Sequence, residues 1–206
     1  MTFYEERVLP HLINFACSTR PNQLQREKVV PLARGDVLEV GFGSGLNLPF
    51  YNTQKVRKIW GLEPSEGMRH KSKALVDASE LDVELIDLPG ESIPLQENSV
   101  DTVLVTYSLC TIPDAIGALK AMRRVLKPGG SLLFCEHGIA PDENVRRWQS
   151  RLNPVWSRVA GGCNMNRDIP DLIVKSGFEI TTDERMYIPG AKVLCYNFWG
   201  RARATR

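Results

Sequence analysis

The chain has 206 residues, of which 43% are hydrophobic and 24% charged, and its formal net charge is +2. This length suits one domain with a full core, and the small charge gives no reason to expect nucleic acid as a partner. The five cysteines are odd in number and include no C-x-x-C pair, so we expect neither a disulfide framework nor a zinc ribbon and predict no metal ligands.

The first 33 residues predict a helical cap. Apolar side chains recur at roughly helical spacing over residues 2–18, which predicts an amphipathic helix with a kink at Pro10. A second helix is predicted over residues 22–33, because Gly35 lies just beyond its end.

Strands and helices alternate over the next hundred residues. Buried strands are predicted over residues 36–40, 58–62, 83–88, 101–106 and 131–135. Ser65 is a suitable N-cap for a helix that reaches residue 79, and a helix over residues 114–126 ends at a Pro-Gly-Gly turn. This alternation implies a parallel sheet with right-handed crossovers.

The C-terminal part departs from this alternation. Helices are predicted over residues 143–159 and 170–176, followed by two strands over residues 178–182 and 192–198. The short link between these strands indicates an antiparallel pair. The last three arginines, Arg201, Arg203 and Arg206, predict a frayed, solvated tail. The predicted fold class is α/β, with a doubly wound, seven-stranded, mainly parallel sheet, a reversed edge strand and helices on both faces.

A glycine-rich turn follows the first predicted strand, in the sequence Val-Leu-Glu-Val-Gly-Phe-Gly-Ser-Gly over residues 37–45. Such a turn presents backbone N–H groups to an anion or dipole, and Gly41, Gly43 and Gly45 allow a ligand to approach closely. Leu46 occupies the position of the last glycine in the dinucleotide fingerprint, which disfavours a pyrophosphate. Glu39 would be costly to bury unless an ammonium group or a fixed water network offset its charge.

A second acidic residue, Glu63, ends the second predicted strand. A carboxylate at this place can accept hydrogen bonds from both hydroxyls of a ribose. The alternative is a helix-start charge favoured by the helix dipole. After the glycine turn, the ribose interpretation is favoured.

Four blocks in this order resemble class I S-adenosylmethionine (SAM)-dependent methyltransferases of the type 11 group. They are residues 37–45, Gly-Leu-Glu-Pro-Ser at 61–65, residues 90–101 and Leu-Lys-Pro-Gly-Gly at 126–130. The resemblance covers residues 34–135. It implies a Rossmann-like fold and SAM as the cofactor, with S-adenosylhomocysteine as the product. One domain over residues 1–206 would then comprise the helical cap (1–33), a cofactor-binding half (34–135) and a substrate-side half (136–206).

The resemblance also implies which residues bind the cofactor: Glu39, Gly41, Phe42, Gly43, Gly45, Asn47, Glu63, Pro64, Ser65, Met68, Gly90, Glu91, Ser92, Thr106 and Tyr107. Glu39 and the glycines would face the methionine part, Glu63 the ribose and Met68 the adenine. Pro89 stands where many relatives have an Asp that accepts from the adenine amino group. Backbone groups or Glu91 would replace that contact.

Methyl transfer from a sulfonium is an in-line displacement, so the protein mainly aligns the two reactants and excludes water. His137 follows the fifth strand and is the predicted general base, because the ordinary pKa of histidine suits neutral pH. The alternative is a histidine that only hydrogen-bonds to the backbone. The predicted substrate residues are His11, Ser108, Cys110, Cys163, Asn164 and Arg167. Packing is the alternative role for Cys163, and pairing with Asp168 or Asp171 is the alternative for Arg167.

Three blocks after the fifth strand resemble the alkyl thiol methyltransferases of animals and their bacterial relatives. They are Cys-Glu-His-Gly at 135–138, Leu-Asn-Pro-Val-Trp at 152–156 and Gly-Cys-Asn-Met-Asn-Arg at 162–167. This resemblance implies S-methylation of a small, lipophilic thiol. The alternatives are methylation of a quinone or phenol ring or of a phospholipid amine, an arsenite methyltransferase with clustered thiols, and a SAM-binding protein without catalysis.

The partners expected from the sequence are a small-molecule substrate and, through the apolar face of residues 3–15, the surface of a membrane. No apolar run approaches the ~20 residues of a membrane span. Because no signal peptide is recognised either, the expected location is the reducing cytoplasm.

Overall fold

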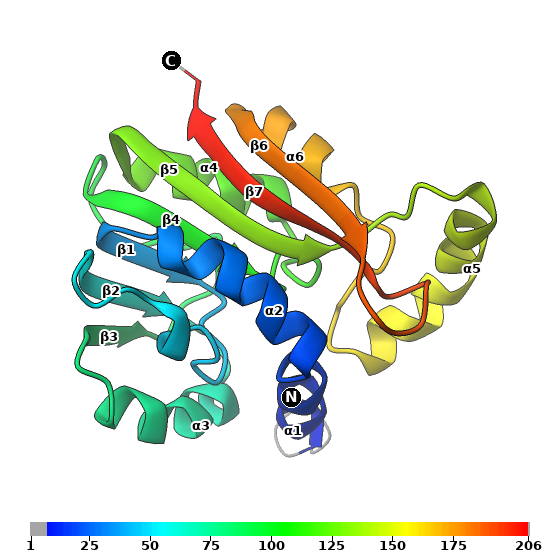
Figure 1. Ribbon diagram of the computed structural model, residues 1–206, viewed down its shortest axis with the longest axis horizontal. Coiled ribbons are helices and arrows are strands. Elements are labelled where there is room, and N and C mark those ends of the chain that lie inside the picture. The colour runs from blue at the N-terminus through cyan, green and yellow to red at the C-terminus, as the bar shows by residue number, and fades with distance from the viewer. Residues whose placement is uncertain (1–7, 206) are drawn as a thin grey trace.

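A computed structural model describes residues 8–205. Its centre is a seven-stranded sheet in the order β3-β2-β1-β4-β5-β7-β6 (Figure 1). The strands are β1 (Gly35–Val40), β2 (Val56–Leu62), β3 (Asp82–Ile86), β4 (Val100–Thr106), β5 (Leu126–His137), β6 (Phe178–Tyr187) and β7 (Tyr196–Ala204). All neighbours are parallel except β5–β7 and β6–β7. This confirms the predicted α/β class, with the reversed strand β7 in the edge pair and inserted between β5 and β6.

Helices cover both faces of the sheet. They are α1 (Leu9–Cys17), α2 (Arg20–Val29), α3 (Glu66–Asp77), α4 (Ala115–Val125), α5 (Glu143–Val159) and α6 (Ile169–Lys175). One core cluster joins α4 and α6 to the sheet, and a second joins it to α2 and to the short 3-10 turns η2 (Val30–Leu32) and η3 (Leu48–Phe50). Helix α5 projects beyond the strand ends, and Gln149 is its buried residue (Figure 1). None of the helices over residues 8–205 is long and apolar enough to cross a membrane.

The prediction of a frayed tail is wrong for Arg201 and Arg203, which lie within β7. Arg206 lies outside the described residues. The Arg201 guanidinium donates to the Ser131 hydroxyl at 2.7 and 2.9 Å. In β7, buried and exposed residues alternate, and the inward positions include Gly200 and Ala202. Because these residues are small, the strand lacks the usual pattern of large apolar side chains. The last strand therefore runs from residue 196 to 204 rather than from 192 to 198.

The kink predicted at Pro10 stays a prediction, because most of the helix expected before Pro10 lies outside the described residues. Helix α1 begins at Leu9, so Pro10 lies in its first turn, where the missing N–H has no intrahelical partner to lose. The part of the predicted helix before residue 8, with Phe3, lies outside the described residues.

The register brings the carboxyl ends of four strands to one edge of the sheet. Val40 at the end of β1 pairs with Leu62 of β2 and with Val105 of β4, and Thr106 of β4 pairs with Cys135 of β5. The residues that follow these ends therefore lie near one another, which is where open α/β sheets bind ligands.

Candidate functional site

The glycine turn leaves β1 with backbone angles that favour glycine. Gly41, Gly43 and Gly45 have φ values of +75°, +59° and +80°. A side chain at Gly41 would overlap the Ser108 hydroxyl, so this position also needs glycine for space. The Phe42 side chain packs in the core instead of facing the turn, and only its backbone remains near a ligand. The turn is thus held tightly between β1 and the segment after β4.

Glu63 lies across the glycine turn. Its carboxylate accepts the Gly43 N–H at 2.8 Å and the Ser65 N–H at 2.9 Å, and burial raises its pKa above the ordinary value. Ser65 caps α3 as predicted, accepting from the Met68 N–H. The Met68 side chain lies next to Gly43. Because each carboxylate oxygen has two lone pairs, Glu63 keeps acceptor capacity for the hydroxyls of a sugar.

Glu39 is buried and has two partners from its own chain. Its carboxylate accepts the Tyr51 hydroxyl at 2.6 Å and the Asn47 amide at 2.9 Å. Asn47 also donates to Thr106 at 2.9 Å and accepts from Arg26 at 3.0 Å. Sequence reasoning missed Tyr51 and Arg26, because neither belongs to a recognised motif. Asn47, predicted to bind the cofactor, connects Glu39 to β4.

Burial raises the pKa of Glu39 from its ordinary value of 4.5 to about 7, against the lowering effect of Tyr51 and Asn47. Folding thus favours the protonated form of Glu39. The stability that this group contributes is fully present below pH 4.5 and is lost as the pH rises towards 7. Relative to Glu39→Gln, the wild-type protein should lose about 3 kcal/mol of unfolding free energy between pH 4.5 and 8. Urea denaturation of both proteins across this range measures the difference, and parallel pH curves would contradict the expectation.

Four further residues predicted to bind the cofactor lie outside the glycine turn. Gly90 is buried against Val40 and Ile112, and the Glu91 carboxylate accepts the Asp114 N–H at 3.3 Å. The side chains of Pro64 and Ser92 are exposed.

An acidic residue does stand at the end of β3, at Asp87 rather than at position 89. It forms a two-bond ion pair with Arg69 at 2.6 and 2.8 Å, and Arg69 also donates to the Glu63 carbonyl. Sequence reasoning missed this pair, although an Asp directly after a strand is a usable signal.

The exit of β4 is held in an unusual backbone conformation. Tyr107 has a φ of +51°, which is rare outside glycine and typical of functional sites. Its hydroxyl donates to Asn197 at 2.8 Å, and the Arg26 guanidinium lies 5.0 Å from the centre of its ring. Thr106 is buried, and Ser108 lies against the glycine turn. Thr106 is therefore joined to the segment after the turn through Asn47, whereas the Tyr107 side chain contacts Asn197 and Arg26 instead.

Glu136 lies at the end of β5, next to His137. One carboxylate oxygen accepts the N–H groups of Ser108 and Leu109 at 2.7 and 3.0 Å, and this bond pair fixes the turn after β4. The other oxygen is buried and has no hydrogen-bond partner among the described residues. Burial raises the pKa of Glu136. An acidic residue within a buried strand was a usable signal, as it was for Glu39.

Three of the predicted acceptor-side residues meet. The ligand atoms of Cys110, His137 and Cys163 all lie within 4.8 Å of one another, and the His137 Nε2 lies 3.2 Å from the Cys163 sulfur. Burial lowers the pKa of His137, but Cys163 and Glu136 together raise it more, and the net shift is upward. We call these three residues the Cys-His cluster.

The other predicted acceptor residues have structural partners. Asn164 donates to the Cys110 carbonyl, through its backbone at 2.8 Å and its side chain at 3.1 Å. The Arg167 guanidinium donates to the carbonyls of Leu109 and Ile112 rather than pairing with Asp168 or Asp171. His11 is exposed and contacts Lys71 of α3 at 2.9 Å.

Helix α1 lies over the glycine turn. Asn14 accepts from the Ser44 hydroxyl, and His11 reaches α3 through Lys71. At its other side, Leu9 and Ile13 contact the position of Gly161, just beyond α5. The helix thus connects the turn, α3 and the segment that contains Cys163.

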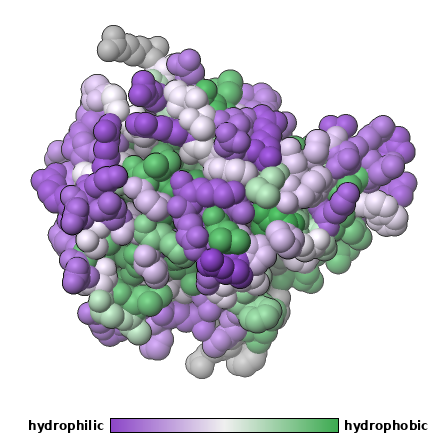
Figure 2. Space-filling view, in the orientation of Figure 1, coloured by the Kyte–Doolittle hydropathy of each residue, from purple (hydrophilic) through white to green (hydrophobic). Residues whose placement is uncertain are grey.

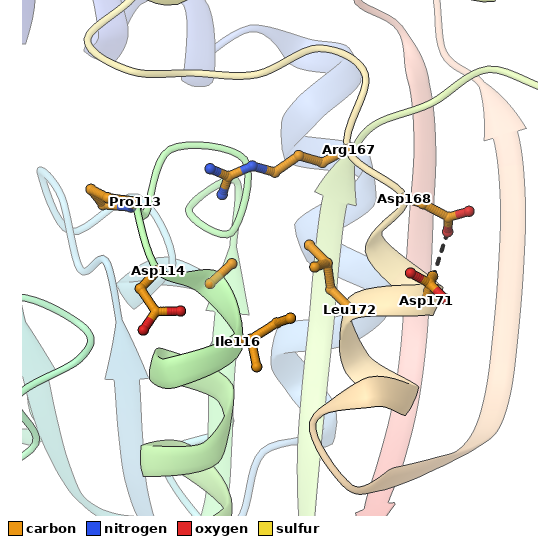
Figure 3. A pocket seen from close by; sticks show the side chains of 8 residues that line it. Pro113, Asp114, Ile116, Arg167, Asp168, Asp171 and Leu172 are labelled. Atoms are coloured by element: carbon orange, nitrogen blue, oxygen red, sulfur yellow. Dashed lines mark hydrogen bonds between the residues drawn. The ribbon is translucent and has the colours of Figure 1, made fainter.

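A cavity of about 270 Å³ lies between the N-terminal ends of α4 and α6 (Figure 3). Figure 3 shows the Arg167 side chain reaching towards the loop of Pro113 and Asp114 above this cavity. Its lining contains Arg167 but neither the glycine turn nor Glu63. The cavity is therefore separate from the site built around the strand ends.

The chain is similar to known methyltransferases. A family model described as a methyltransferase domain matches residues 38–134. Thiol S-methyltransferase TMT1B of Rattus norvegicus is 32% identical over 146 residues, covering 69% of this chain and 59% of that protein. Thiol S-methyltransferase TMT1A of Homo sapiens is 29% identical over 152 residues, covering 72% and 62%. The chain thus spans about six tenths of the length of these curated relatives.

Solved structures share the fold over nearly the whole chain. A chain from the complex between the Haloferax volcanii Trm112 methyltransferase activator and a methyltransferase has a TM-score of 0.72, with 17% identity, 100% of this chain covered and 98% of the other. A SAM-dependent methyltransferase of Thermotoga maritima has a TM-score of 0.66 and 22% identity, with 97% of each chain covered. At these identities the likeness concerns the fold.

Proposed function

Because this chain belongs to the class I SAM-dependent methyltransferases, with SAM as the cofactor, we propose that it transfers the methyl group to the sulfur atom of a small, lipophilic thiol. The observation that carries the choice of acceptor is the Cys-His cluster, which lies where β4 and β5 end. The likeness to two thiol S-methyltransferases supports the same choice.

The surroundings of the glycine turn suit this cofactor. Gly43 leaves space beside Met68 that a side chain would fill, and the Glu63 carboxylate lies within hydrogen-bonding distance of the same turn. In the proposed complex, Glu63 holds the ribose hydroxyls and Met68 packs on the adenine. The cofactor supplies a methyl group that is already activated, so the protein must align the reactants and exclude water. Helix α1, bonded to Ser44, is placed to exclude water.

Glu63→Ala is expected to weaken SAM binding by 1–3 kcal/mol, about the loss of hydrogen bonds to a charged group. Titration calorimetry measures this change. Glu66→Ala is the matched control, because Glu66 is exposed in the first turn of α3 and shares only the helix-start position. Equal effects of the two substitutions would mean that Glu63 acts through the helix dipole and not on the ribose.

The acceptor is tested by measuring S-adenosylhomocysteine release with SAM and a panel of alkyl thiols, quinols and phospholipid amines. Turnover with thiols, and a methyl thioether as the product by mass spectrometry, is the expected result. Demethylmenaquinone methyltransferase of Bacillus mycoides is 40% identical, but over 80 residues that cover 38% of this chain. Turnover with quinols alone would mean that the acceptor is a quinol and not a thiol. SAM binding without any turnover would favour a non-catalytic role.

The surface beside the acceptor site also supports a peripheral contact with a membrane. Leu12 and Phe15 of α1 are 52% and 75% exposed. Helix α5 exposes Trp148, Leu152 and Val155. It also carries four arginines, at positions 146, 147, 151 and 158. Figure 2 shows apolar surface, in green, on the lower side of the lobe that α5 forms. Apolar side chains next to arginines are typical of helices that lie on anionic lipid.

The double substitution Leu12→Glu with Phe15→Glu is therefore expected to reduce binding to phosphatidylglycerol vesicles at least tenfold, since each apolar side chain contributes about 1.5–3 kcal/mol when buried. Vesicle co-sedimentation measures the binding. Leu75→Glu on α3 is the control, because Leu75 is exposed but lies on another helix. No binding by the wild-type protein would remove the membrane from the proposal.

A further inference from the structure

We propose that Cys110, His137 and Cys163 bind a zinc-type divalent ion, and that the ion's open fourth position takes the sulfur of the acceptor thiol. The first half of this proposal stands on the cluster alone. The second half rests on the proposed function. No metal ligands were predicted from the sequence, because the three residues are far apart along the chain and form no short motif.

The spacing of the three ligand atoms fits a tetrahedral ion. With Zn–S and Zn–N bonds of about 2.3 and 2.0 Å, two sulfurs stand about 3.8 Å apart and a sulfur and a nitrogen about 3.6 Å apart. In the structure all three atoms lie within 4.8 Å, and the His137 Nε2 to Cys163 sulfur distance is 3.2 Å. Closing a separation of up to 4.8 Å to about 3.8 Å needs side-chain movements of up to about 1 Å.

The cluster is held in place by hydrogen bonds from its surroundings. Asn164, next to Cys163, is bonded to the carbonyl of Cys110 through both its backbone and its side chain. Asn153 of α5 donates to the Asn164 side chain at 3.0 Å and accepts the Met165 N–H at 2.9 Å. These bonds fix the loop that carries Cys163 against the turn after β4. Preorganised ligands of this kind favour metal binding.

A second loop anchor comes from Gln149, which is fully buried. Its amide donates to the carbonyls of Gly138 and Met165 at 3.0 and 2.8 Å, and its oxygen accepts the Ala140 N–H at 3.0 Å. Gln149 therefore joins the segment after His137 to the segment after Cys163. The same helix thus positions two of the three ligands.

Two buried atoms beside the cluster lack a hydrogen-bond partner among the described residues. They are the His137 Nδ1 and one carboxylate oxygen of Glu136. A buried carboxylate oxygen without a partner is costly, and a nearby cation offsets that cost. A metal-bound histidine usually donates its second ring nitrogen to a carboxylate, carbonyl or water. An ion at the cluster would therefore offset the cost of burying the Glu136 oxygen, whereas the His137 Nδ1 would still need a partner such as a water.

Three protein ligands with one open position are the arrangement of catalytic rather than structural zinc sites. Cys110 is buried, whereas His137 and Cys163 are partly exposed, so the cluster has an accessible side. Two cysteine thiolates neutralise the charge of a divalent ion, which lowers the cost of holding it at a partly buried place.

The proposed step is balanced. When the acceptor sulfur binds the ion, its S–H bond breaks and the proton leaves to solvent. A lone pair of that sulfur then forms the S–CH3 bond while the bond between the methyl carbon and the sulfonium breaks, and its electron pair stays on the cofactor's sulfur. The products are a methyl thioether and S-adenosylhomocysteine. The thioether is a weak, neutral ligand and is released.

Cobalt(II) titration of the full chain under a phosphine reductant tests the metal site. We expect one equivalent to produce the thiolate-to-cobalt charge-transfer band and the visible bands of tetrahedral cobalt, and one equivalent of zinc to remove them. Cys110→Ser, Cys163→Ser and His137→Ala should each weaken cobalt binding at least tenfold. Cys195→Ser is the control, because Cys195 lies outside the cluster. Circular dichroism establishes that each variant is folded.

Cobalt bands that are absent from folded wild-type protein, or retained in all three cluster variants, would overturn the metal site. Addition of a small alkyl thiol should shift the visible cobalt bands of the wild type, and unchanged bands at saturating thiol would overturn its role in binding the acceptor. S-adenosylhomocysteine release with thiols is measured separately. Turnover in protein shown to be metal-free would overturn the ion's role in binding the acceptor while the proposed function stood.

Discussion

Gly41→Ala is expected to weaken SAM binding by 10- to 100-fold and to reduce turnover at subsaturating SAM by the same factor. The added Cβ overlaps the Ser108 hydroxyl, and the φ of +75° is one that alanine rarely adopts. Overpacking typically costs 1–3 kcal/mol, and each 1.4 kcal/mol corresponds to about a tenfold change in affinity. The turn can relieve the overlap only by moving, and this movement also displaces the Gly43 N–H that Glu63 accepts. Titration calorimetry with SAM measures the effect.

The control Gly129→Ala distinguishes the steric overlap at Gly41 from the cost of placing alanine at a positive φ. Gly129 has a similar φ of +79°, but nothing lies within 4 Å of its Cβ position. It should lose stability and keep its affinity for SAM. Adding Ser108→Gly to Gly41→Ala should restore part of the affinity by removing the hydroxyl. Normal SAM binding by Gly41→Ala would place the cofactor away from this turn.

His137→Ala should lower the rate of methyl transfer to a thiol by about 10²–10⁴-fold, the range for losing a group that assists deprotonation. SAM affinity should be unchanged, because His137 lies at the end of β5 beside Cys163 and not at the glycine turn. Single-turnover measurements at saturating SAM and saturating thiol isolate this step from cofactor binding.

His70→Ala is the matched control for this substitution, because His70 is exposed on α3. It should have near wild-type rates. A thiol that is supplied already ionised, at a pH above its own pKa, should recover much of the loss in His137→Ala. A variant that kept the full rate with neutral thiols would show that His137 is a packing residue.

The order of the strands and helices could be predicted from the sequence because it depends on local signals. Apolar periodicity, the N-cap at Ser65 and the turn after α4 each act within a few residues, and the structure confirms these elements. The glycine turn and Glu63 were also recognisable, since their roles follow from their places directly after a strand.

Other features could not be predicted from local sequence patterns. In β7, small residues occupy inward positions and alternate with arginines, so the sequence lacks the apolar periodicity typical of a strand. Tyr51 and Arg26, which complete the surroundings of Glu39, belong to segments with no motif of their own.

The α/β class and the order of the strands and helices followed from the sequence, whereas the division into halves and the roles of the acceptor-side residues stay predictions. The meeting of Cys110, His137 and Cys163 is seen only in the three-dimensional structure. Cys110 follows β4, His137 ends β5 and Cys163 follows α5, and nothing in their spacing along the chain predicts contact. The difference lies in the distance along the chain over which each effect acts. Backbone propensity and hydrophobic periodicity act between near neighbours in the chain, whereas the meeting of three side chains depends on strand register and on the helix that returns the chain to the sheet edge.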